Sequence, residues 1–235
     1  MEKEHVYYGQ GKSISTVSQS FMANVFIWMS AGLVMTAAIA FLFANNASLL
    51  SLLLTERGWS VLGYIVLFAP LGFVLVMNFA FEKLSYGLLV VLFMAYSALM
   101  GMSLSVIFLV YTANSIYSIF FVTAGMFAVT AIYGYTTKAD LTRIGNLLMM
   151  ALFGIIIASV INMFLHSDTL SYVMSVVSVV VFTGLTAYNV QNLKNIYNDG
   201  SERTGKLAII GALSLYINFV NLFLALLRLF GNRRD

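Results

Sequence analysis

The 235-residue sequence lacks cysteine and contains one proline and two histidines. Without cysteine there is no disulfide framework, thiol nucleophile or sulfur-ligated metal site. His5 and His166 lie far apart in the chain, and two isolated histidines do not form an ordinary zinc site. The single proline and the absence of Gly/Ser-rich tracts exclude collagen-like, linker-like and disordered classes.

Charge is also scarce, because charged residues make up 9% of the sequence and hydrophobic residues 61%. The mean hydropathy is +0.93. Soluble domains carry about 25% charged residues, most of them on the hydrated surface. The composition therefore excludes an ordinary soluble enzyme and makes the lipid bilayer the principal partner of this chain.

Long uncharged runs separate the few charges. A membrane-spanning helix needs about 20 mostly apolar residues, and the longest run has room for two such helices with a polar turn at 111–115 between them. The runs are apolar on all sides and do not alternate, which favours helices over a barrel. We predict an all-α integral membrane protein, a bundle of seven transmembrane helices near residues 21–44, 60–81, 85–110, 117–136, 144–165, 169–192 and 207–229. Pro70, inside the second span, predicts a kink rather than a break.

The distribution of Lys and Arg predicts the orientation. Eight of them lie in the N-terminal segment and the second, fourth and sixth connections, whereas the first, third and fifth connections carry only Arg57. Because basic loops stay in the cytoplasm, we expect a cytoplasmic N-terminus. Seven crossings would place the C-terminus outside. Arg228, Arg233 and Arg234 argue against that, which leaves a re-entrant last segment as the alternative.

These patterns divide the chain into a cytoplasmic segment at 1–20, a seven-helix transmembrane domain at 21–231 and a short basic tail at 232–235. The first six spans contain no acidic, basic or histidine side chain, although coupled transporters commonly place such groups in their spans. No nucleophile–base pair, metal cluster or dense basic stripe is present. We therefore expect no enzymatic activity, no cofactor and no nucleic-acid partner.

The last span carries a stripe of small and polar residues at steps of three or four, which places them on one helical face. They are Gly211, Ser214, Asn218, Asn221, Ala225 and Arg228. One interpretation is close helix packing with a few interhelical hydrogen bonds. The other is a hydrated path or gate, because buried amides and an arginine are otherwise costly in a membrane.

The sixth span offers partners for this stripe. Thr186 and Asn189 lie three residues apart near its cytoplasmic end, where the seventh span begins. We predict that Asn189 and Asn218 come within hydrogen-bond reach of each other if Asn218 is buried about as deeply. In the third span, Ser97, Gly101 and Ser105 form a small-xxx-small series that predicts helix packing.

Three segments carry a family resemblance: Gly211–Gly231 (GALSLYINFVNLFLALLRLFG), Gly134–Leu141 (GYTTKADL) and Thr186–Lys194 (TAYNVQNLK). The first resembles the signature of the Bax inhibitor-1 family, in the form of its bacterial members. The second resembles that family's fourth connection and the third the end of its sixth span. The resemblance covers essentially residues 20–234.

This resemblance implies a bundle whose last helix is central and is surrounded by the other six, in a bacterial inner membrane. It also implies a passive, pH-sensitive leak channel with calcium as the permeant ion. The alternative it implies is a non-conducting regulator that binds a membrane-bound quality-control protease or another membrane protein. Eukaryotic relatives are described as suppressors of cell death.

The sequence departs from the family at the sensor. The resemblance implies a proton-sharing pair of aspartates at positions 189 and 218, whereas this chain has Asn189 and Asn218. Asparagine has nearly the shape of aspartic acid but does not titrate near neutrality and carries no charge. Two explanations remain: a natural subgroup with a different gate, or substitutions engineered to fix one state. In either case the pore and gate positions are Asn189 and Asn218, with Thr186, Ser214, Asn221 and Arg228 as polar neighbours.

Overall fold

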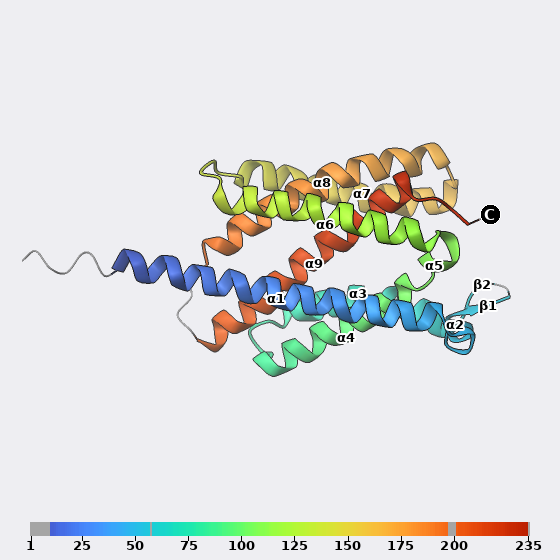
Figure 1. Ribbon diagram of the computed structural model, residues 1–235, viewed down its shortest axis with the longest axis horizontal. Helices are drawn as coiled ribbons and strands as arrows, with labels where there is room; N and C mark the ends of the chain where they lie inside the picture. The colour runs from blue at the N-terminus through green and yellow to red at the C-terminus, as the bar shows by residue number, and fades with distance from the viewer. Residues whose placement is uncertain (1–9, 57, 197–200, 235) are drawn as a thin grey trace, which may run out of the picture.

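The computed structural model describes residues 10–56, 58–196 and 201–234 (Figure 1). Seven helical spans in these residues are long and apolar enough to cross a membrane, which confirms the predicted all-α membrane fold. The long helices are α1 (Gln10–Ala44), α3 (Val61–Phe79), α4 (Tyr86–Leu104), α6 (Ala113–Thr136), α7 (Thr142–Leu165), α8 (Asp168–Lys194) and α9 (Glu202–Phe230). The short elements are α2 (Ala47–Leu53), α5 (Ile107–Val110) and an antiparallel hairpin of β1 (Leu54–Thr55) and β2 (Gly58–Trp59).

Five of the long helices begin directly after a serine or threonine whose hydroxyl accepts a backbone N–H from the first helical turn. These N-caps are Ser60, Ser85, Thr112, Ser167 and Ser201. A cap satisfies a donor that has no partner inside the helix. The capping explains why α6 begins at Ala113 and α9 at Glu202, several residues before the predicted starts at 117 and 207.

Two other predicted boundaries differ. Helix α1 begins at Gln10 and so extends into the segment predicted to precede the first span. The third span is continuous only to Leu104, where the helix gives way to a turn before α5. At this turn the N–H of Ser105 is shared between the carbonyls of Gly101 and Met102, and its hydroxyl donates to Met102 as well. Pro70 lies within helix α3 and does not break it, in agreement with that part of the prediction.

Helix α9 runs through the middle of the bundle (Figure 1). It packs against α1 and α4 on one side and against α6 and α8 on the other. Helix α3 packs mainly against α4, and α7 packs mainly against α8. In the most apolar stretch of α9, 67% of the residues are buried, whereas in the most apolar stretch of α7 no residue is buried. The last helix is therefore central, as the resemblance implied. Four helices rather than six form its immediate surroundings.

A buried hydrogen-bonded group joins α1, α4 and α9. The Thr36 hydroxyl donates to the carbonyl of Ser97 at 2.8 Å and lies 2.6 Å from the hydroxyl of Tyr216, which is fully buried. Beside it, a Cβ on Gly101 would lie 2.7 Å from the carbonyl oxygen of Thr36. The small residues of α4 thus allow close packing on α1, as the Ser97–Gly101–Ser105 series predicted.

The C-terminal tail bears on whether the last segment crosses or re-enters. Helix α9 ends at the opposite end of the bundle from the start of α1 (Figure 1). There the N–H of Thr112 donates to Asn232 O at 3.0 Å and the N–H of Arg234 to Val110 O at 2.9 Å. Residues 232–234 are thus attached to the start of α6, and this end-to-end course of α9 favours a crossing over a re-entrant segment. Asp235 lies outside the described residues.

The absence of native cysteine allows a direct test of orientation. Thr55→Cys lies in the hairpin at one end of the bundle, and Ala139→Cys lies in the α6–α7 connection at the other end. Both residues are exposed. We expect a membrane-impermeant maleimide applied to intact cells to label Thr55→Cys and to label Ala139→Cys only after lysis, because the basic connections stay inside. The reverse pattern would contradict the predicted cytoplasmic N-terminus.

Candidate functional site

The candidate site lies where α8 and α9 pack against each other as antiparallel helices. Their contact is close near Gly211, where a Cβ would lie 2.6 Å from a methyl group of Leu193. One helical turn further along α9, the Asn189 side-chain amide donates a hydrogen bond of 3.2 Å to the Ser214 hydroxyl. Two predicted site residues on different helices are therefore in direct contact.

Asn218 lies on the next turn of α9 and is 4% exposed. Its amide nitrogen is buried and has no hydrogen-bond partner among the described residues. The direct bond predicted between Asn189 and Asn218 is not formed, because the Asn189 amide bonds to Ser214 instead. Asn189 itself is only half-buried, so the condition of equal depth is not met.

Thr186 and Asn221 also lie along this interface, but both bond within their own helices. The Thr186 hydroxyl is fully buried and donates to the Phe182 carbonyl at 2.7 Å. The Asn221 amide donates to the Ile217 carbonyl at 2.9 Å. Such bonds to the preceding turn satisfy a polar side chain without an interhelical partner.

Thr183 is a residue that the sequence reasoning missed. Its hydroxyl is buried and has no hydrogen-bond partner among the described residues. Thr183 lies one helical turn before Ala187, whose backbone packs against Gly134 of α6, so Thr183 is on the α6 side of α8. We define the polar seam as the predicted site residues of α8 together with the α9 residues that run antiparallel to them: Thr186, Asn189, Ser214, Asn218 and Asn221.

Arg228 does not join the seam. It is exposed, and it lies ten residues beyond Asn218, which corresponds to about 15 Å along a helix. Arg228 is therefore at the surface and is not the costly buried charge that the sequence suggested. No group of three or more metal-ligating side chains of the His, Cys, Asp or Glu type occurs in the described part of the chain.

The two shorter family-like segments meet at one end of the seam. Gln191 accepts from the N–H of Leu141 at 2.9 Å and donates to the carbonyl of Ala139 at 2.7 Å. Lys194 donates to the Tyr135 carbonyl at 2.7 Å, and its ammonium lies 5.1 Å from the centre of the Tyr135 ring. These contacts hold the α6–α7 connection against the C-terminal end of α8, a few residues after Asn189.

Asp140 organises the same connection. Its carboxylate accepts hydrogen bonds from the hydroxyl of Thr142 at 2.6 Å and from the Thr142 N–H at 2.9 Å. The hydroxyl bond, followed by the backbone bond, holds the pKa of Asp140 below its ordinary value. The charged form of this exposed carboxyl therefore helps to define the start of α7 at neutral pH.

Comparison with known proteins gives the family. The family model "Inhibitor of apoptosis-promoting Bax1" matches residues 18–235. The chain belongs to the Bax inhibitor-1 family. It is 50% identical to the "Inner membrane protein YbhL" of Escherichia coli K12, over 92% of this chain and 93% of the relative. It is also 41% identical to an uncharacterised protein of Borreliella burgdorferi, over 96% and 97% of the two chains. An uncharacterised membrane protein of Streptococcus pyogenes serotype M6 is 33% identical over 97% and 98%.

Helix α6 contains a matched pair of glycines that tests this packing. A Cβ on Gly134 would overlap the Ala187 carbonyl oxygen and lie 2.8 Å from the Ala187 Cα, whereas one on Gly125 meets nothing within 4 Å. Backbone atoms cannot rotate away, so we expect Gly134→Ala to lower the free energy of unfolding by about 1–3 kcal/mol. Gly125→Ala should leave it unchanged or raise it by up to about 1 kcal/mol.

Thermal unfolding of both variants in one mild detergent measures the difference. Equal stability of the two variants would mean that α6 and α8 are not in this close contact.

Proposed function

We propose that this protein is a passive cation leak channel, with calcium as a permeant ion, whose path follows the polar seam between α8 and α9. The observation that carries the proposal is a buried atom of the seam, Asn218 Nδ2, which has no hydrogen-bond partner among the described residues. An unsatisfied polar atom is costly at membrane depth. Water between the two helices would satisfy this atom and would make the seam a hydrated path.

The chemistry of the seam suits a weakly held cation. Its acceptors are the amide oxygens of three asparagines and the hydroxyls of Ser214 and Thr186, and oxygen is the ligand type that calcium prefers. All of these groups are neutral, and the six long helices before α9 carry one carboxylate, Asp168 at the first position of α8. Neutral oxygens attract a divalent ion less strongly than carboxylates, which favours slow passage over storage.

Family membership supports the same assignment, since the resemblance implied a calcium leak at these positions. Membership and the inner-membrane name of the Escherichia coli relative also support a place in the bacterial inner membrane. The proposal includes no enzymatic activity, no resident cofactor and no nucleic-acid partner. It retains the cytoplasmic N-terminus that the charge distribution predicts.

The neutral pair at 189 and 218 leads to a prediction about pH. Amides do not titrate near neutrality, so calcium efflux from liposomes should vary by less than about twofold between pH 6 and 8. Restoring both acids with Asn189→Asp and Asn218→Asp should create a pair that shares a proton, in which one carboxyl has a raised pKa. Efflux from that double variant should change by more than about fivefold over the same range.

The controls separate the pair from the rest of the protein. The single variants Asn189→Asp and Asn218→Asp test whether both acids are required. Arg228→Gln alters a charge outside the seam and should leave the pH profile flat. A steep pH response from the unmodified chain, or a profile that the double restoration leaves unchanged, would contradict the proposed gate.

The second candidate is a non-conducting regulator that binds a membrane-bound protease or another membrane protein. The close contact of Gly211 with Leu193 favours it, since such a contact closes the seam at one end. Absence of calcium efflux from reconstituted protein, together with copurification of a membrane protease after mild detergent extraction, would favour this candidate over the channel.

A further inference from the structure

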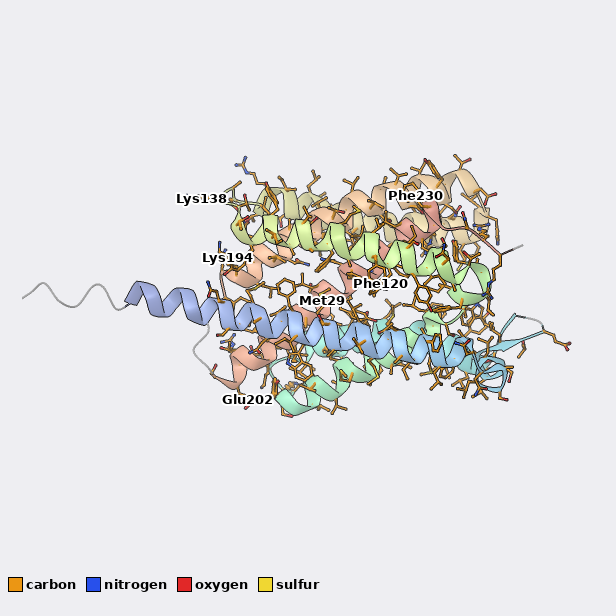
Figure 2. The ribbon with its side chains drawn as sticks, viewed as in Figure 1. Met29, Phe120, Lys138, Lys194, Glu202 and Phe230 are labelled. Carbon is orange, nitrogen blue, oxygen red and sulfur yellow. The ribbon has the colours of Figure 1, made fainter. Side chains whose placement is uncertain are left out.

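An apolar groove runs between α1 and α6, with α9 at its base. Its larger part has a volume of about 640 Å³ and its smaller part about 360 Å³, and both parts are lined by Leu33, Phe120 and Phe219. In Figure 2, Met29 and Phe120 lie in the space between α1 and α6. We propose that the larger part binds one acyl chain of an anionic phospholipid, a role separate from the proposed ion path.

The position of the groove matches one leaflet of a bilayer. On α1 the two parts together reach from Gln19 to Phe41, which corresponds to about 33 Å of helix, close to the hydrocarbon thickness of about 30 Å. The larger part ends at Leu33, about 21 Å from Gln19. It therefore extends from the headgroup level to the middle of the membrane, as a lipid chain does.

The dimensions favour a hydrocarbon chain over a protein helix. A volume of about 640 Å³ spread over about 21 Å gives a mean cross-section of about 30 Å². A helix about 10 Å wide needs about 80 Å². A hydrocarbon chain, whose carbons make contacts at about 4 Å, needs about 20 Å². One acyl chain fits this cross-section, whereas a transmembrane helix could lie only partly within the groove.

The lining is apolar along most of its length. Phenylalanine, methionine, leucine, isoleucine and alanine side chains form the walls, and Ser30 interrupts them once. At the base, the ring of Phe219 packs edge-on against Phe120 and Phe127, with ring centres 5.5 and 5.6 Å apart. Because Phe219 follows Asn218 in the chain, a bound acyl chain would touch the helix that carries the polar seam.

One end of the groove is polar and basic. Gln19 and Tyr135 line it there, and Lys194 is held against Tyr135 by its hydrogen bond to the Tyr135 carbonyl. Figure 2 places Lys194 and Lys138 toward the end of the bundle where α1 begins. A basic side chain near the membrane surface attracts anionic headgroups by about 1 kcal/mol. The charge therefore orients the lipid, with its headgroup beside Lys194 and its chain toward Leu33.

Two neighbouring residues of α6 provide a matched test. Ala128 lines the groove, whereas Val129 is 70% exposed and does not line it. The full-length protein in mild detergent is incubated with 1-palmitoyl-2-oleoyl-phosphatidylglycerol, and bound lipid is counted by native mass spectrometry. We expect Ala128→Trp to lower the bound lipid by about fivefold or more and Val129→Trp to leave it unchanged. Equal retention by the two variants would overturn the proposal.

A second measurement uses the unmodified protein, so that it does not depend on the folding of Ala128→Trp. Phosphatidylglycerol with a photoreactive group on its acyl chain should crosslink to residues 22–33 and 120–135 in preference to α3 and α7. Crosslinks spread evenly over the lipid-facing helices would refute a specific groove, and so would a protein segment captured there instead.

A separate variant tests whether the lipid headgroup lies beside Lys194. Lys194→Gln should reduce the preference for phosphatidylglycerol over phosphatidylcholine while acyl-chain crosslinking in the groove persists. An unchanged preference would contradict the assigned orientation. Calcium efflux is measured separately, so a failure of the lipid proposal and a failure of the proposed channel are distinguishable.

Discussion

A polar side chain on a membrane-spanning helix that faces lipid finds no hydrogen-bond partner outside its own helix, and this constraint favours a central position for α9. Helix α9 carries Ser214, Asn218 and Asn221 along one face in its middle. Placing α9 in the centre removes these groups from lipid. The four helices packed against α9 cover them, and α8 supplies the partner of Ser214.

The same constraint gives the two faces of α9 different properties. Toward α1 and α4, Tyr216 is fully satisfied by Thr36 in a tightly packed group that holds three helices together. Toward α8, the buried Nδ2 of Asn218 has no hydrogen-bond partner in the part of the chain that the structure describes. A satisfied face is stable as it stands, whereas a partly satisfied one favours entry of water or rearrangement. This contrast locates the proposed path on the α8 side.

The helix ends show where sequence reasoning was limited. Hydropathy located all seven spans, because apolar length is a property of composition alone. It placed the starts of α6 and α9 too late, since Thr112 and Ser201 begin these helices in polar sequence through their caps. The break after Leu104 was missed because residues 84–137 are uncharged throughout and the turn there is made by hydrogen bonds of Ser105.

By itself the sequence determined that this is a seven-span helical membrane protein, that small and polar residues form a stripe on one face of the last span, and that positions 189 and 218 are neutral. Each of these follows from residue type and spacing along one helix. Only the tertiary structure decided that Asn189 bonds to Ser214, that Asn218 Nδ2 has no partner among the described residues, and that Arg228 is exposed. It also decided that α1 and α6 leave an apolar groove over Phe219. Those features depend on the depth and register at which different helices meet, and no single helix carries that information.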